Sequence, residues 1–90
     1  MQTEMINTVA VLDQPAGRPI PSDPNALLFP LEVAYLLGLD RRTLDSWRLR
    51  GDGPRFVRIS ARAIRYLRAD LLAWIEARIV SSTSEPTAAD

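Results

Sequence analysis

Hydrophobic residues recur with helical spacing in residues 30–37. The positions that share one side of this stretch are Val33, Ala34, Leu36 and Leu37. Pro30 suits a first helical turn, because proline lacks the amide hydrogen that would go unbonded there. Phe29 stands where a polar cap is usual, while Glu32 suits the positive end of the helix dipole. The pattern predicts a helix that ends at Gly38.

A second helical stretch, residues 41–50, follows after only the three residues Gly38-Leu39-Asp40. Leu44 and Trp47 lie three positions apart and point the same way, so we expect both in the core. Asp40 is expected to cap this helix with its side chain. Two helices joined by a short turn with a glycine form a helix-turn-helix unit.

Apolar and polar residues alternate in residues 55–59 and again in residues 63–66. This alternation predicts a two-stranded hairpin whose connection, residues 60–62, lacks the usual glycine and is expected to be wide. An isolated hairpin is only marginally stable, so some of its apolar side chains must pack on the helices. The candidates are Phe56 or Val57, Ile59 and Ile64.

A last periodic stretch predicts a helix from about Arg68 to Val80. Its core-facing residues are Leu71, Trp74 and Ile75. The expected fold is mainly α with a small β-hairpin: a winged helix-turn-helix over residues 27–80, with a C-terminal helix after the two-stranded wing.

The two ends of the chain are expected to lie outside this domain. Residues 1–26 hold four of the seven prolines and form an arm, either disordered or, in residues 5–12, a strand that pairs with a sheet edge. Residues 81–90 are polar and are expected to be a disordered tail.

The residue types that are absent narrow the function. The chain has no cysteine and no histidine, which removes the commonest metal ligands and the usual general base. We expect no enzyme activity, metal or cofactor, and no small-molecule effector. No apolar run approaches the ~18 residues of a membrane span, and the N-terminus lacks the basic start of a signal peptide. A cytoplasmic protein is expected.

A net charge of zero conceals a strongly basic centre. Residues 1–26 and 80–90 each carry −2, whereas residues 41–68 hold nine arginines against Asp45 and Asp52, a local net charge of +7. A basic centre of this kind is the electrostatic signature of a protein that binds a polyanion such as DNA.

The pieces RRTLDSWRLRGDGPRFVRI and RYLRADLLAWI lie within residues 27–79, which resemble the AlpA and excisionase type of winged helix-turn-helix in the MerR-like superfamily. The resemblance implies a bacterial protein that binds double-stranded DNA, with the helix of residues 41–50 in the major groove and the hairpin on the backbone or minor groove. The implied groove contacts are Arg41, Arg42, Thr43, Asp45, Ser46 and Arg48. The implied wing contacts are Arg55, Arg58, Arg62 and Arg65.

Some residues of these segments have a second interpretation. Asp45 could accept a hydrogen bond from a cytosine amino group, but a salt bridge with a nearby arginine is favoured. Leu49 could touch a thymine methyl group, but packing is favoured. Core positions are also favoured over base stacking for the aromatic residues Trp47, Tyr66 and Trp74.

Four apolar residues stand where the family usually has charged ones. They are Leu31, Tyr35, Leu72 and Ile79. Together they suggest a protein-contact surface and self-association along DNA. We therefore expect an excisionase (recombination directionality factor) that binds attachment-site DNA cooperatively and directs an integrase toward excision. The alternatives are a small AlpA-like transcription regulator that binds promoters and a protein-interaction module that does not bind DNA.

Overall fold

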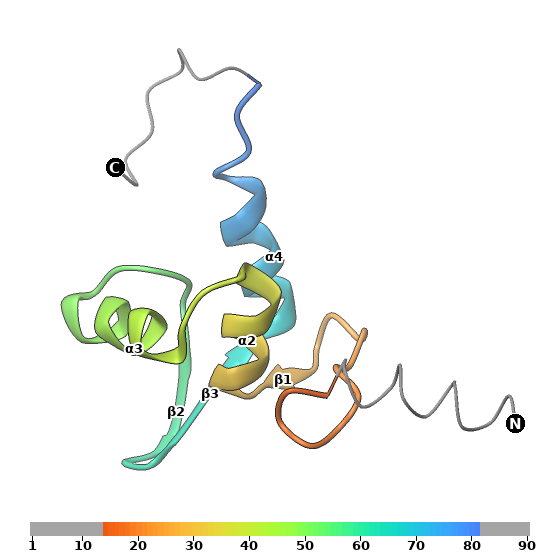
Figure 1. The fold of residues 1–90 in the computed structure, drawn as a ribbon, viewed down its shortest axis with the longest axis vertical. Helices are drawn as coiled ribbons and strands as arrows, with labels where there is room; N and C mark the ends of the chain where they lie inside the picture. Colours follow the sequence, from red (N-terminus) through yellow and green to blue (C-terminus); the bar gives the residue numbers. More distant parts are fainter. Residues whose placement is uncertain (1–13, 82–90) are drawn as a thin grey trace, which may run out of the picture.

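The computed structural model describes residues 14–81 and shows three helices and a small three-stranded antiparallel sheet within them (Figure 1). The elements, in chain order, are β1 (Leu27–Leu28), α2 (Pro30–Leu37), α3 (Arg41–Arg50), β2 (Val57–Ser60), β3 (Ala63–Leu67) and α4 (Arg68–Glu76). This arrangement confirms the predicted winged helix-turn-helix. No helix in the described part of the chain is both long enough and apolar enough to span a membrane.

The two helices of the helix-turn-helix unit begin and end where the sequence predicts. Phe29 precedes α2 and donates its backbone N–H to the Glu32 carboxylate at 2.8 Å, which compensates for the missing polar cap. Gly38 ends α2 in the left-handed conformation, at φ 70°. Asp40 occupies the N-cap position of α3, but the expected capping bond is wrong: its side chain caps no amide. Because Asp40 is exposed, water can reach the free amides of this turn.

The sheet has one more strand than the sequence predicts, in the order β1-β3-β2. Leu27 and Leu28 of β1 pair with Leu67 and Tyr66 of β3. A strand of two residues is too short to show an alternating pattern of apolar and polar residues. The local sequence therefore does not predict that this segment pairs with β3, which is distant in the chain. The extra pairing fixes the wing hairpin to the body of the domain.

The wing hairpin turns more tightly than expected. Ser60 pairs with Ala63, so only two residues form the turn, and the register shifts between Arg58 and Ser60. Ile59 falls in this irregular segment and is exposed, as is Val57. The expectation that Ile59 packs on the helices is wrong, because β2 is an edge strand whose four residues are all exposed. Of the two alternatives Phe56 and Val57, it is Phe56 that packs against the core, and Ile64 is buried in the core as predicted.

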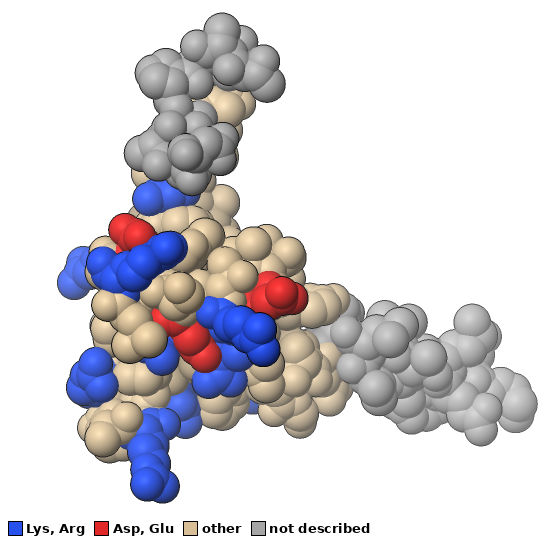
Figure 2. Space-filling model, turned by 60° about the vertical axis from the view of Figure 1, so that its left-hand side comes forward, with Lys and Arg blue, Asp and Glu red and all other residues tan. Residues whose placement is uncertain are grey.

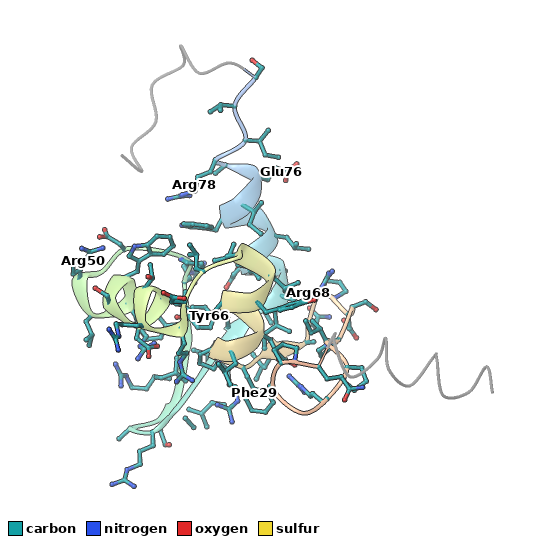
Figure 3. All side chains as sticks on the ribbon, in the orientation of Figure 1. Phe29, Arg50, Tyr66, Arg68, Glu76 and Arg78 are labelled. Atoms are coloured by element: carbon teal, nitrogen blue, oxygen red, sulfur yellow. The ribbon has the colours of Figure 1, made fainter. Side chains whose placement is uncertain are left out.

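One hydrophobic core joins the helices to the sheet. Its buried members are Leu28, Val33, Ala34, Leu44, Ile64, Tyr66 and Leu71, with Trp47 and Ile75 packed against them. The Trp47 and Trp74 rings lie 5.7 Å apart, and Figure 3 shows Tyr66 in the interior between the helices. The core position of Tyr66 is thereby confirmed, and Trp47 packs against the core, while Trp74 is half-buried beside Trp47. Leu36 was expected to face the core, but it is exposed, because the buried side of α2 is that of Val33 and Ala34.

The last helix is shorter than predicted: α4 ends at Glu76 rather than near Val80. After it, the amides of Arg78 and Ile79 donate hydrogen bonds to carbonyls three residues back. Bonds of this kind form a 3₁₀ turn, which is tighter than an α-helix, whose amides bond four residues back. The guanidinium of Arg78 lies 3.9 Å from the centre of the Trp74 ring and bonds to the Trp74 carbonyl. No glycine or proline marks this end, so the sequence pattern runs past it.

The loop before β1 belongs to the folded body. Arg18 forms an ion pair with Glu32, and Ile20 packs against the core. The amides of Arg68 and Ala69, at the start of α4, bond to the carbonyls of Ala26 and Pro24. Residues 14–26, expected as part of an arm, thus pack against residues 27–80. The strand suggested for residues 5–12 and most of the polar tail lie outside the described residues.

Candidate nucleic-acid interface

Helix α3 exposes one side to solvent while the other is anchored in the core. Leu44 is buried and Trp47 half-buried. The exposed side carries Arg42, Ser46 and Leu49. These three positions follow helical spacing, since residues four and seven apart return to one face. The folded chain therefore presents a continuous exposed side along α3, and we call these three residues its candidate reading face.

Leu49 is the most exposed large hydrophobic residue in the described chain, at 84%. The expectation that it packs is wrong, because the buried side of α3 is that of Leu44 and Trp47. Thr43, one of the candidate groove contacts, is half-buried near the edge of the reading face. The spacing of these residues in the sequence did not predict that Leu49 is exposed and Thr43 half-buried.

Asp45 forms two salt bridges within α3, as the favoured interpretation of the sequence predicts. Its Oδ1 accepts a hydrogen bond from Arg48 at 2.8 Å and another from Arg41 at 3.2 Å. Partial burial acts to raise the pKa of the Asp45 carboxyl, but the two arginines outweigh it and hold that pKa below its usual value. The same pairing raises the pKa of Arg48. Asp45 thus neutralises part of the charge of the helix.

The two arginines that hold Asp45 differ in their exposure. The side chain of Arg48 is 16% exposed and donates a 2.8 Å hydrogen bond to Asp45, so burial and this bond fix its position. The side chain of Arg41 is 46% exposed, and it can reach solvent while it contacts Asp45. Arg41 is therefore available to a ligand, whereas Arg48 mainly holds Asp45 in position on α3.

The candidate wing arginines also fall into two groups. Arg55, Arg58 and Arg62 are exposed. Arg65 is half-buried: its guanidinium lies 4.4 Å from the centre of the Phe29 ring and donates a hydrogen bond to the Ile64 carbonyl. Figure 2 shows basic side chains recurring over the face that carries α3 and the wing, with fewer acidic ones between them. The wing thus offers three exposed cations.

A hollow of about 520 Å³ lies between the reading helix and the wing. Four of the candidate arginines line it: Arg41, Arg48, Arg62 and Arg65. The rest of its wall consists of Phe29, Pro30 and Leu31 at the start of α2, Ala61 and Ile64 of the wing, and Pro15 and Ala16. A concave surface lined by guanidinium groups can hold an anionic backbone through charge-assisted hydrogen bonds. No group of three or more carboxylates in residues 14–81 is arranged to hold a metal ion.

The four residues suggested for protein contact are all exposed. Leu31 and Tyr35 lie on α2, Leu72 lies on α4, and Ile79 follows the end of α4. These residues do not belong to the exposed side of α3. The molecule therefore exposes apolar side chains on elements other than the reading helix.

Comparison with models of protein families gives a match to one family. No curated protein matches the chain. Residues 31–79, more than half of the chain, match a helix-turn-helix domain family. The matched segment includes α3, the wing and α4, and begins just after the proline that starts α2. On this match and the geometry above, the chain belongs to the helix-turn-helix domain family of DNA-binding proteins.

Proposed function

We propose that this protein is a recombination directionality factor, an excisionase, that binds double-stranded DNA at an attachment site and directs an integrase toward excision. Its resemblance to the AlpA and excisionase type supports this role. The observation that carries the proposal is the separation of two surfaces. Arginines surround α3 and the wing, while exposed apolar residues lie on α2 and α4; the two surfaces meet at Leu31, which also lines the arginine-lined hollow. One surface suits DNA and the other suits neighbouring copies of the protein.

The proposed mechanism involves no covalent chemistry. Exposed arginines of the wing, Arg58 and Arg62, contact phosphates and set the position of the protein. Arg42 and Ser46 of α3 read base edges in the major groove. Arg41 can leave Asp45 for a phosphate at small cost, because a half-exposed salt bridge is worth at most about 1 kcal/mol.

A single domain of this size covers too little DNA for high selectivity on its own. Interfaces of single small modules bury roughly 600–1,000 Å² of protein surface, whereas larger assemblies bury more. Copies bound side by side would add affinity and could hold the duplex in a bent shape. In this proposal Leu31, Tyr35, Leu72 and Ile79 supply the contacts between copies.

Footprinting at increasing protein concentration tests the proposal. An excisionase is expected to give a long footprint that grows cooperatively, and an excision assay with the integrase should depend on the protein. A short footprint of constant length at a promoter, with no effect on excision, would instead indicate the transcription regulator. Absence of any mobility shift at moderate salt would indicate the protein-interaction module.

The protein-contact surface has a matched control on the same helix. Tyr35 and Leu36 of α2 are 47% and 44% exposed, but their side chains point in different directions around the helix. We expect Tyr35→Ser to shorten the footprint and to leave binding of the first copy unchanged. Leu36→Ser should keep the full footprint. If both changes shorten it equally, the contact surface is assigned to the wrong side of α2.

A further inference from the structure

Leu49 has no structural role within the described fold. Its side chain is 84% exposed, above Ile79 at 71% and every other large hydrophobic residue described. It lies one residue before the end of α3, and the core is filled from the other side of the helix by Leu44 and Trp47. A leucine fully exposed to water gains nothing from burial, so its apolar surface is available to a ligand.

The surroundings of Leu49 on α3 are polar. One turn earlier stand Asp45 and Ser46, and its chain neighbours are Arg48 and Arg50. Figure 3 shows Arg50 at the outer end of the helix. A protein partner that covered Leu49 would also have to cover Asp45 and Ser46, and aspartate and serine are depleted at protein interfaces. The ligand that suits Leu49 is therefore a small apolar group surrounded by polar groups.

Leu49 shares the reading face with Arg42, seven positions earlier. Seven residues make almost two helical turns, so the two side chains point the same way about 10 Å apart along the axis. The major groove of B-DNA is about 12 Å wide and admits an α-helix. A groove that accepts Arg42 and Ser46 therefore also brings Leu49 near the base edges.

The base edges of the major groove offer one apolar group, the C5-methyl of thymine. We infer that Leu49 is a specificity-determining residue that contacts the C5-methyl group of one thymine in the target site. The inference rests on the proposed reading of DNA by α3. It adds a preference for thymine within about three base pairs of the position that Arg42 contacts, since base pairs are spaced about 3.4 Å along the duplex.

Uracil substitution tests this contact, because uracil keeps the hydrogen-bonding edge of thymine and lacks only the methyl group. Each thymine of the protected site is replaced in turn, and the affinity of the full chain is measured by fluorescence anisotropy. At one thymine, we expect the replacement to weaken binding about fourfold, the usual effect of one buried methyl group. Leu49→Ala should bind the thymine and uracil duplexes equally. Leu36→Ala, a change of an exposed leucine on α2, should keep the fourfold difference.

Each outcome decides the inference. It stands if one thymine shows the loss with the wild type and with Leu36→Ala, but not with Leu49→Ala. It is overturned if the wild type prefers its site over random DNA yet is insensitive to uracil everywhere, or if Leu49→Ala remains sensitive. If no fragment is bound in preference to random DNA, the proposed function itself fails and the inference fails with it. Circular dichroism verifies that Leu49→Ala folds, as expected for so exposed a side chain.

Discussion

Arg18 and Glu32 form a bidentate ion pair that joins the loop before β1 to the first turn of α2. Both hydrogen bonds measure 2.9 Å, and the Glu32 side chain is completely buried. The pairing raises the pKa of Arg18. The same guanidinium bonds to the Leu27 carbonyl and lies over the Phe29 ring. A single side chain from outside the family match thus holds the start of the helix-turn-helix unit.

Removal of Arg18 should therefore destabilise the whole domain. We expect Arg18→Ala to lower the free energy of unfolding by about 1–3 kcal/mol, because the buried carboxylate of Glu32 loses its partner. Urea denaturation measures the change. Arg18→Ala combined with Glu32→Gln should be less destabilised than the sum of the two single variants, since no buried charge remains unpaired. Additive losses would show that the pair is not coupled.

Gly53 and Gly51 form a matched pair for a test of backbone geometry. Both have a positive φ, 82° and 83°, so alanine costs roughly 1–2 kcal/mol at either position. A Cβ on Gly53 would also lie 3.1 Å from Trp47, whereas one on Gly51 meets open space. We expect Gly53→Ala to lower the thermal midpoint more than Gly51→Ala and to change the tryptophan fluorescence. Equal shifts in the two variants would contradict the contact with Trp47.

The pH dependence of stability should reveal the Asp45 salt bridges. Asp45 has a lowered pKa in the folded state, so the unfolded state binds more protons in acid and the contribution of Asp45 is lost as the pH falls. That contribution is fully present above the ordinary carboxyl value of 3.8 and disappears as the pH drops through the lower folded value. Urea titrations of the wild type and Asp45→Asn should therefore differ most near neutral pH and converge once the pH has fallen below the lowered folded value. A constant difference would rule out this linkage.

Arg42 and Arg62 should affect DNA binding in different ways. Arg42→Ala is expected to weaken binding to the specific site by about 1–3 kcal/mol, because it removes a base contact. Arg62→Ala should weaken binding to every sequence and reduce the salt slope by about 1, because it removes a phosphate contact. Anisotropy titrations at several salt concentrations measure both effects. An unchanged slope for Arg62→Ala would remove Arg62 from the phosphate contacts.

Local signals made the two central helices predictable from the sequence. Pro30 and Gly38 fix the ends of α2, and the apolar spacing of Leu44 and Trp47 places α3. The strand of Leu27 and its neighbour could not be predicted, because two residues carry no periodic pattern. The helix α4 was predicted too long for a different reason, because no glycine or proline follows Glu76 to mark its end.

The sequence located the basic surface but could not rank its arginines. Arg48 is only 16% exposed and Arg65 lies half-buried over the Phe29 ring, which makes them partly structural. No spacing rule separates them from exposed Arg62, because burial of an arginine depends on how the helices and the wing pack together. One feature of the sequence indicates the role of Arg18. It is an arginine in an acidic, proline-rich segment, and the helix that follows lacks a polar N-cap.

The pairing of Leu27 with Leu67 has a consequence for how the domain folds. These residues are 40 positions apart, whereas α2, α3 and the wing hairpin form from neighbouring residues. Closing the longer loop costs more chain entropy, so we expect β1 to join the sheet after the transition state. Stopped-flow measurements on Arg18→Ala should then show faster unfolding and an almost unchanged folding rate. The segment ahead of the helix-turn-helix unit would then set how long the folded domain persists rather than how quickly it forms.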